Sequence, residues 1–280
     1  MKNLGYYNGK YGELDTLVVP FNDRVHFFGD GVYDATYSHN YKIYALDDHI
    51  DRFYNSAGLL DINLPMPKEE MKALLYDMVR KVDTGDQFVY WQATRGTQIR
   101  NHSYDPKIIA NIWIVLKPAT IKNPYIKMKV ITMEDTRFLH CNIKTLNLLP
   151  SVVASQKAES MGCQETILVR DGIVTECAHS NVSILKDGKF ITAPTDHYIL
   201  PGITRMHIIK MCKKLLIPVD ETKFTLDYLM DADEIIVSSA GQLAIGVSEV
   251  NGIKVGGRAP ELLKKIQDAL IEEFKAETRI

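Results

Sequence analysis

The segment CNIKTLNLLP, residues 141–150, places Lys144 beside a run of apolar residues. An ammonium group is costly to bury without a partner, and a buried lysine commonly loses its proton instead. A deprotonated amine in an apolar pocket is a good nucleophile toward carbonyl compounds. The alternative is an aliphatic stem that covers apolar surface with the ammonium in water, as for most lysines. We expect the apolar neighbours of Lys144 to position its amine.

Two further segments have the residue types of an anion-binding site. In LPGITRMHII, residues 200–209, a glycine-bearing turn leads into a helix whose first N–H groups and Thr204 hydroxyl favour an anion. The small, polar loop 238–241 follows an apolar strand, where a loop in contact with a ligand is often found. A capped helix and an ordinary turn are the structural alternatives.

Glu176, in VTECAHSNVS, follows the turn formed by Asp171 and Gly172. A glutamate in a loop is usually solvated. The functional alternative is that Glu176 holds a proton on a ring nitrogen. A lysine that forms a Schiff base, a phosphate-binding helix start and a carboxylate partner together indicate pyridoxal 5'-phosphate as the cofactor.

The elements that must position these residues are strands and helices intermixed along the chain, without a regular βαβ rhythm. Strands are predicted at residues 32–38, 87–94, 108–116, 126–132 and 234–238, with short strands within 166–191, and helices at 47–60, 68–82, 151–161, 203–216 and 261–274. In the fourth helix we expect Met206, Ile209, Cys212 and Leu216 to face inward.

This pattern predicts an α/β (α+β) protein of two domains with mixed sheets, since the length also exceeds that of a typical single domain. The segment from Pro118 to Pro124 is poor in apolar residues and is the predicted linker. It separates an N-terminal α/β domain, residues 1–117, from a C-terminal cofactor-binding domain, residues 125–280.

Composition excludes several other classes of protein. The 280 residues are 46% hydrophobic and 24% charged, with a formal net charge of −2, so no basic surface suggests nucleic acid as a partner. No apolar run approaches the length that crosses a membrane, and no signal peptide is apparent. The four cysteines are scattered, which argues against zinc or a disulfide framework and favours the cytoplasm.

The chain resembles the fold-type IV pyridoxal-phosphate aminotransferases, and among them most closely those that act on D-amino acids. The resemblance runs nearly end to end and rests on motifs in the family's order: RVHFFGDGVYD (24–34), DDHIDRFYNSA (47–57), TRGTQIRNH (94–102), CNIKTLNLLPSVVA (141–154), VTECAHSNV (174–182) and LPGITR (200–205). It implies the two-domain fold of that family and a homodimer with shared active sites.

The resemblance also implies roles for individual residues. Lys144 bonds the cofactor and later moves a proton between the substrate and the cofactor, and Glu176 pairs with the pyridine nitrogen. The phosphate is held by residues of three segments: Arg52, Ile203, Thr204, Ser239 and Ala240. The enzyme that acts on D-amino acids carries a threonine hydroxyl at the position of Ala240. One phosphate contact is therefore lost here, or replaced by backbone, Ser239 or water.

For the substrate, the resemblance implies that Tyr33, Arg100 and His102 bind the α-carboxylate, the last two from the neighbouring subunit. The reaction implied is a ping-pong exchange of the amino group between D-amino acids, such as D-alanine, and 2-oxo acids, such as 2-oxoglutarate. Residues 177–179 (Cys-Ala-His) replace a serine-rich run of the family, which changes the pocket wall and leaves the side-chain preference open.

Other functions within the same fold remain as alternatives. Aminodeoxychorismate lyase shares the lysine and the glutamate, but the presence of Arg100 and His102 argues against it. A branched-chain or an R-selective amine transaminase is also possible. A non-catalytic pyridoxal-phosphate carrier is a further alternative, against which the retention of Lys144, Glu176 and Arg52 argues.

Overall fold

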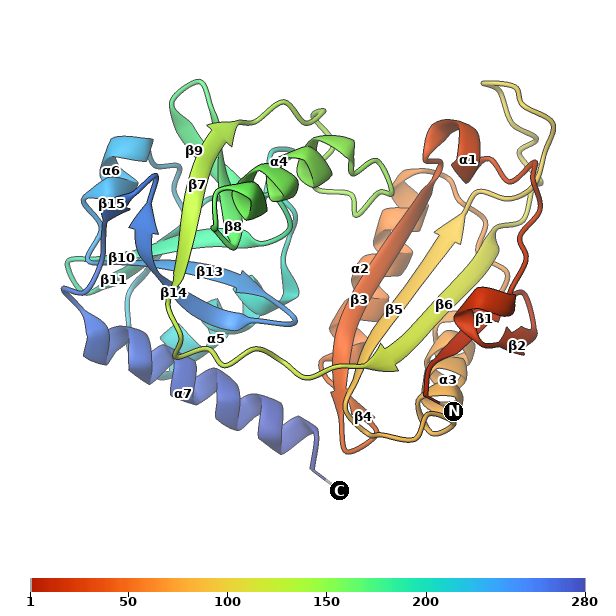
Figure 1. Ribbon diagram of the computed structural model, residues 1–280, viewed down its shortest axis with the longest axis horizontal. Coiled ribbons are helices and arrows are strands. Elements are labelled where there is room, and N and C mark those ends of the chain that lie inside the picture. The colour runs from red at the N-terminus through yellow and green to blue at the C-terminus, as the bar shows by residue number, and fades with distance from the viewer. Residues whose placement is uncertain (1, 280) are drawn as a thin grey trace. The chain divides into compact units, whose positions relative to one another are not determined.

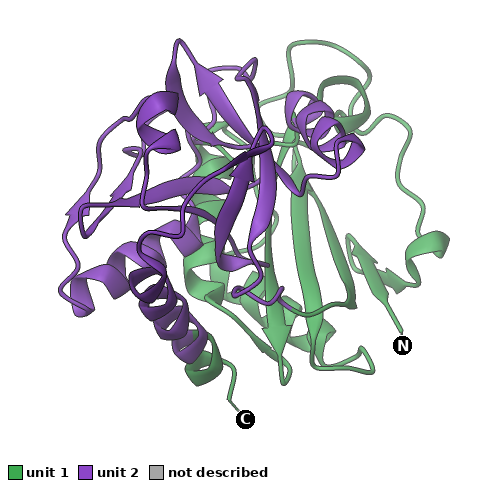
Figure 2. Cartoon of the chain, turned by 60° about the vertical axis from the view of Figure 1, so that its left-hand side comes forward, with its two compact units in different colours: residues 1–120, 143–147, 274–280 green, residues 121–142, 148–273 purple. Residues whose placement is uncertain are grey.

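The computed structural model describes residues 2–279, and the chain forms two compact units, coloured separately in Figure 2. Unit 1 comprises residues 1–120, 143–147 and 274–280, and unit 2 comprises residues 121–142 and 148–273. Met1 and Ile280, the outer ends of the two predicted domains, lie outside the described residues. The segment that carries Lys144 thus belongs to unit 1, although it is distant in sequence from most of that unit.

Unit 1 is built on a six-stranded sheet in the order β2-β1-β6-β5-β3-β4, with every pairing antiparallel. Its strands are β1 (Leu4–Tyr7), β2 (Lys10–Gly12), β3 (Gly31–His39), β4 (Lys42–Ile43), β5 (Gln87–Thr94) and β6 (Asn111–Pro118). Its helices are α1 (Val25–Phe28), α2 (Leu46–Leu59) and α3 (Lys68–Val79), with a short 3-10 turn at Leu14–Thr16. The strand predicted at 87–94 is confirmed. The strand predicted at 108–116 corresponds to β6, which begins later, at Asn111, and ends at Pro118. Pro118 is also the first residue of the predicted linker.

The core of unit 1 lies between one face of this sheet and the helices α2 and α3, which cover that face in Figure 1. Alternate residues of β5 point into it, because successive side chains of a strand face opposite sides of the sheet. Each layer contributes fully or almost fully buried apolar side chains: Val89, Trp91 and Ala93 from β5, Ile50, Phe53 and Ala57 from α2, and Met71, Leu75 and Met78 from α3. The helix predicted at 47–60 therefore buries the face that its periodicity indicated.

Residues 143–147 run alongside the start of β3. Thr145 forms an isolated bridge with Val32, and the Leu146 N–H donates to the Gly31 carbonyl at 3.0 Å. This pairing uses backbone groups of β3 that β4 does not reach, because β4 pairs only with Ser38 and His39. The short segment is thereby fixed on the sheet of unit 1.

Unit 2 contains a nine-stranded sheet in the order β12-β11-β10-β13-β14-β7-β8-β9, with β15 also paired to β14. The pairings β11–β12, β14–β7 and β7–β8 are parallel and the others are antiparallel, so this is the mixed sheet of the molecule (Figure 1). Its strands are β7 (Met128–Glu134), β8 (Glu165–Arg170), β9 (Ile173–Cys177), β10 (Asn181–Lys186), β11 (Lys189–Thr192), β12 (Val219–Asp220), β13 (Glu234–Ser239), β14 (Leu243–Val250) and β15 (Ile253–Lys254).

The helices of unit 2 are α4 (Leu149–Ser160), α5 (Ile203–Lys214), α6 (Leu226–Met230) and the part of α7 (Pro260–Glu277) up to residue 273. In α5 the predicted inward residues Ile209 and Cys212 are buried, but Met206 is exposed and Leu216 is 90% exposed. The prediction for Leu216 is wrong because α5 ends at Lys214, and Leu216 lies beyond it at φ 58°.

None of the helices within residues 2–279 combines the length and the apolar content that crossing a membrane requires. The four cysteines are free thiols, and two of them, Cys177 and Cys212, are buried.

Candidate active site

Lys144 is held in unit 1 by its main chain. Its N–H donates to the Ser56 hydroxyl on α2 at 3.2 Å, and its carbonyl accepts from the Tyr33 N–H on β3 at 3.0 Å. The ammonium nitrogen lies 4.3 Å from the centre of the Tyr33 ring, within range of a cation–π contact. Of its apolar neighbours, Ile143 is buried, while Leu148 is 37% and Leu149 74% exposed within one chain. The expectation that apolar neighbours position the amine stays a prediction. Hydrogen bonds fix the main chain of Lys144, and the Tyr33 ring contacts its amine.

Arg52, on α2, is paired with Asp34, on β3. Its Nε donates to Asp34 Oδ2 at 2.9 Å and its Nη2 to Asp34 Oδ1 at 2.7 Å, an arrangement that fixes the plane of the guanidinium. His49, one turn before Arg52, places Nδ1 2.7 Å from Asp34 Oδ1. All three side chains are less than a tenth exposed.

The closeness of Asp34, Arg52 and His49 and their burial shift the pKa values of Asp34 and His49. Burial alone would raise the pKa of Asp34, but Arg52 and His49 lower it well below its usual range. Burial lowers the pKa of His49 despite the neighbouring Asp34 carboxylate. The sequence analysis did not single out Asp34 or His49. Two features of the sequence could have indicated them. One is a single aspartate in an otherwise uncharged strand, and the other is a histidine three residues before the arginine on one helix.

Arg100 and His102 lie together on an exposed loop of unit 1. The Arg100 guanidinium carbon is 5.3 Å from the centre of the Phe28 ring, and the His102 ring is 5.2 Å from the same ring. Phe28 ends the short helix α1. Tyr33, the third residue assigned to carboxylate binding, instead contacts Lys144 and stacks on Tyr90.

Glu176, on β9 of unit 2, is buried and surrounded by donors. Arg137 Nη1 donates to Oε1, while Asn181 Nδ2 and the Leu200 N–H donate to Oε2 at 2.9 and 3.1 Å. Since both oxygens accept hydrogen bonds, the side chain has the environment of an ionised carboxylate. The alternative of a solvated loop glutamate is therefore excluded by its 5% exposure.

Arg137 joins Glu176 to a second buried carboxylate, Asp135. Its Nε and Nη2 donate to the two oxygens of Asp135 at 2.9 and 2.8 Å, and the Thr175 hydroxyl donates to Asp135 at 2.8 Å. Burial alone would raise the pKa of Asp135, but Arg137 and Thr175 lower it to about 2. Burial opposes the charge of Arg137, yet Asp135 and Glu176 raise its pKa. The sequence analysis did not identify this pair; its signal was an Asp-x-Arg directly after a strand.

Asn181 connects Glu176 to the start of α5. Its Nδ2 donates to Glu176 Oε2 and also to the Leu200 carbonyl at 3.0 Å. Gly202, the residue before α5, is so close that a Cβ there would lie 1.8 Å from Asn181 Oδ1. Any larger residue at position 202 would therefore displace the Asn181 side chain from its present position. Ile203 and Thr204 are the first residues of α5, where backbone N–H groups have no acceptor within the helix.

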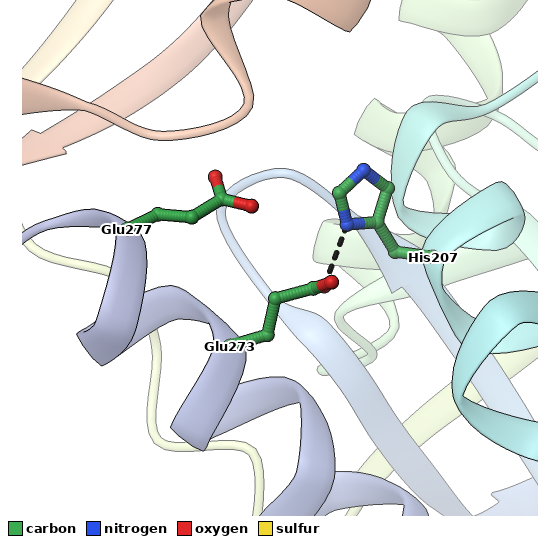
Figure 3. A group of neighbouring side chains, drawn as sticks. All are labelled: His207, Glu273 and Glu277. Atoms are coloured by element: carbon green, nitrogen blue, oxygen red, sulfur yellow. Dashed lines mark hydrogen bonds and ion pairs between the residues drawn. The ribbon is translucent and has the colours of Figure 1, made fainter. Parts of the chain in front are cut away.

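The helix α5 is itself anchored within unit 2. His207, one turn after Ile203, is buried and places Nδ1 2.6 Å from Glu273 Oε2 on α7 (Figure 3). Lys210 Nζ lies 3.3 Å from the other oxygen of Glu273. These contacts hold the helix whose first turn carries the predicted phosphate-binding residues.

Ser239 and Ala240 lie where β13 ends, beside the strand that begins with Asn181. Ser238 is the residue opposite Asn181 in the pairing of β10 with β13. The Ser238 hydroxyl is buried and has no hydrogen-bond partner among the described residues. A buried hydroxyl without a partner is costly, and a bound ligand would satisfy it.

The side chains of residues 177–179, which the resemblance singled out, lie in different surroundings. Cys177 and Ala178 are buried, and the Ala178 side chain packs with Ala154 and Leu168. The half-exposed His179 places Nδ1 3.0 Å from Glu165, a fully buried carboxylate on β8. Two of these three residues therefore belong to the packed interior of unit 2 directly after Glu176.

The structure thus brings several predicted residues together within each unit. In unit 1, Lys144 contacts Tyr33, and Arg100 lies with His102. In unit 2, Asn181 joins Glu176 to the segment that leads into Ile203.

Comparison with known families gives one match, which covers most of the chain. Residues 31–250 match the model of the family described as amino-transferase class IV. The chain is also similar to curated proteins over almost its whole length. It is 36% identical over 277 residues to a D-alanine aminotransferase of Bacillus licheniformis, with 97% of each chain covered. It is 39% identical over 275 residues to a D-alanine aminotransferase of Listeria monocytogenes, with 95% of this chain and 94% of the relative covered.

Solved structures show the same fold at lower identity. The branched-chain amino acid aminotransferase of Escherichia coli superposes with a TM-score of 0.90 at 23% identity, covering 100% of this chain and 96% of the other. A branched-chain amino acid aminotransferase of T.th., in complex with N-(5'-phosphopyridoxyl)-L-glutamate, gives a TM-score of 0.87 at 23% identity, with 98% and 94% covered.

Proposed function

The chain belongs to the class IV aminotransferases, and we propose that it exchanges the amino group between D-amino acids and 2-oxo acids. Enzymes of this family work with pyridoxal 5'-phosphate, which supplies an electron sink for the electrons released at the substrate α-carbon. D-Alanine and 2-oxoglutarate are the proposed substrates, because the relatives named above are D-alanine aminotransferases.

Residues within each unit have the chemistry that this cofactor requires. The Ser238 hydroxyl has no hydrogen-bond partner within residues 2–279, and the N–H groups at the start of α5 lack intrahelical acceptors, as expected of a site for a phosphate. The proposed phosphate ligands are Arg52, Ile203, Thr204, Ser239 and the backbone of Ala240. Lys144 is the proposed covalent attachment point, and Glu176 the proposed partner of the ring nitrogen.

In the proposed mechanism, the Lys144 amine moves the proton of the substrate α-carbon. Glu176 holds a proton on the ring nitrogen, and Arg137 keeps Glu176 ionised and oriented for that purpose through its direct hydrogen bond. Asp34 holds the guanidinium of Arg52 in one plane, so that this side chain need not be ordered when the phosphate binds.

The shared contact of Arg100 and His102 with the Phe28 ring is the observation that carries the substrate proposal. Two hydrogen-bond donors on one loop, one of them a guanidinium, suit a carboxylate. Fixing the carboxylate fixes which face of the α-carbon meets Lys144, and thereby the stereochemistry of the reaction.

We also propose a homodimer in which Arg100 and His102 serve the partner's site. Apolar side chains of unit 2 that are exposed in one chain support it. On α4, Leu149, Val152 and Val153 are 74%, 58% and 54% exposed and follow helical spacing. Clustered exposed apolar side chains are typical of a protein–protein contact. The cytoplasmic location remains a prediction from cysteine usage.

The substrate proposal is tested with a panel of D- and L-amino acids and 2-oxoglutarate, followed by chiral analysis of the glutamate formed. We expect D-alanine to give D-glutamate. Formation of L-glutamate from branched L-amino acids would instead assign the chain to the branched-chain enzymes. An amine that reacts as fast as D-alanine would argue against a carboxylate-binding role for Arg100.

The shared site is tested by mixing Lys144→Ala, which is expected to be inactive, with Arg100→Ala, which is expected to have a raised KM, and assaying at low substrate concentration. In a heterodimer one site carries both defects and the other carries neither, so activity should reappear when subunits exchange. Proven heterodimers without activity would show that Arg100 acts within its own subunit.

A further inference from the structure

Arg24 is a buried arginine to which the proposed reaction assigns no role. Its side chain is 3% exposed, and each of its three nitrogens has an acceptor. Nε donates to Asp30 Oδ2 at 2.8 Å, Nη1 to the Asn101 carbonyl at 2.6 Å, and Nη2 to the His102 carbonyl at 3.2 Å. Two of these bonds thus reach the exposed loop that carries Arg100.

The carboxylate that orients Arg24 is itself fixed. Arg95 Nε donates to both oxygens of Asp30 at 3.0 Å, and its other nitrogens donate to the carbonyls of Leu60 and Asp61. The Arg95 guanidinium also lies 3.8 Å from the centre of the Tyr104 ring, so Arg95 contacts the far side of the same loop. Asp30 therefore connects Arg24 to the rigid part of unit 1.

The bonds of Arg24 extend an existing pairing of two segments. The Arg24 N–H donates to the Gly96 carbonyl at 3.0 Å, and the Gln98 N–H donates to the Asn22 carbonyl at 3.0 Å. The Arg24 side chain continues this attachment to residues 101 and 102. An exposed loop without such bonds would have to be ordered when it binds a ligand, at a cost in affinity.

We propose that Arg24 is a positioning residue for the substrate carboxylate. By fixing the main chain at Asn101 and His102, it sets the directions in which the side chains of Arg100 and His102 point. This inference rests on the proposed function, in which Arg100 and His102 bind the carboxylate.

Arg24→Lys is the variant that tests the proposal, because it keeps the charge but cannot reach three acceptors in a planar fork. We expect KM for D-alanine and 2-oxoglutarate to rise about tenfold with kcat changed less than about twofold, as when binding is lost uniformly. In an Arg100→Ala background, Arg24→Lys should raise KM by much less than it does in the wild type, because only His102 then remains to be positioned. An additive increase would overturn the proposal.

Gln87→Met is a matched control. Gln87 is a buried side chain of unit 1 that also donates to two carbonyls, those of Val79 and Thr84, at 2.8 and 2.6 Å. It lies at the opposite end of β5 from the loop. We expect this variant to lower the thermal midpoint and leave KM unchanged. An equal rise of KM in Gln87→Met would show that general destabilisation explains the effect, and the proposal would be overturned.

Amide hydrogen exchange of residues 98–104 tests the position of the loop without any assay of activity. We expect exchange to be at least about tenfold faster in Arg24→Lys and unchanged in Gln87→Met. Unchanged exchange in Arg24→Lys would overturn the proposal whatever the protein catalyses. Faster exchange with an unchanged KM would overturn the positioning role.

A failure of the proposed function can be distinguished from a failure of this inference. If the wild-type protein transaminates no D-amino acid, the proposed function is wrong, but the exchange rates still decide whether Arg24 fixes the loop. Should Arg24→Lys not fold, Asp30→Asn leaves the arginine in place and removes its carboxylate. It is expected to produce the same changes in smaller measure, and normal exchange in that variant would count against the proposal.

Discussion

Replacing Arg137 by methionine removes the cation that pairs with both buried carboxylates, Asp135 and Glu176. Methionine has a similar length, so the change leaves little space unfilled but removes every hydrogen bond of the guanidinium. The lost bonds include two to Asp135, one to Glu176 and one to the Tyr198 carbonyl. Two like charges then remain in a site that is about 5% exposed.

The expected loss of unfolding free energy depends on the hydrogen bonds and ion pairs that the two carboxylates keep. Asp135 keeps the Thr175 hydroxyl and an ion pair with Arg170 at 3.1 Å, and Glu176 keeps Asn181 and one backbone N–H. Breaking a buried ion pair by removing one partner typically costs about 3–5 kcal/mol, and the remaining donors place this site near the lower end, at about 3 kcal/mol.

Urea-induced unfolding of the wild-type and variant proteins at pH 7 measures this loss. Arg258→Met is the control, because Arg258 pairs with Asp231 and Asp233 in the same unit but is 51% exposed. We expect the control to lose less than about 1 kcal/mol. Adding Asp135→Asn to Arg137→Met should recover part of the loss, because one unpaired charge is removed. If Arg137→Met loses no more stability than Arg258→Met, the reasoning from buried charge is refuted.

Three other outcomes are expected. Lys144→Ala should abolish transamination and remove the visible absorption of the cofactor bound to that lysine, and a variant with normal activity and spectrum would refute its assignment. Arg100→Ala should raise KM for amino and oxo acids about ten- to a hundredfold, equivalent to about 1.5–3 kcal/mol, and should matter far less for an amine without a carboxylate. Asp135 has its pKa lowered from 3.8 to about 2, so roughly 2 kcal/mol of stability is present above pH 4 and lost as the pH falls through 2. Unfolding free energies should therefore depend less on pH in this range in Asp135→Asn, and an unchanged slope would contradict the linkage.

Family membership could be predicted from the sequence, because its motifs are long, ordered and spread over the whole chain. The match of residues 31–250 to the class IV aminotransferases confirms it. The main elements were also predictable. The strand at 87–94 and the helices near 47–60 and 68–82 follow local periodicity, which the sequence contains directly.

The surroundings of the chemical residues were less predictable. The apolar run after Lys144 predicted an apolar environment, but it did not indicate that Leu149 is mostly exposed in one chain or that the main chain of Lys144 bonds to Ser56 and Tyr33. The sequence shows which residues are neighbours along the chain. It does not report which side of an element faces the core, and a helix start such as residues 148–149 has no periodicity of its own.

Residue types and their order alone thus predict a role for the lysine, the glutamate and the anion-binding segments, and these roles stay predictions. Only the tertiary structure decides which buried charges meet. Asp34 reaches Arg52 and His49 because β3 packs against α2, and Arg137 reaches Glu176 across 39 residues of sequence. Arg24 likewise reaches the carbonyls of residues 101 and 102, which are 77 and 78 residues away in the sequence. Such pairs depend on distances of a few ångströms between elements, and the energy of a buried charge changes from unfavourable to favourable within that range.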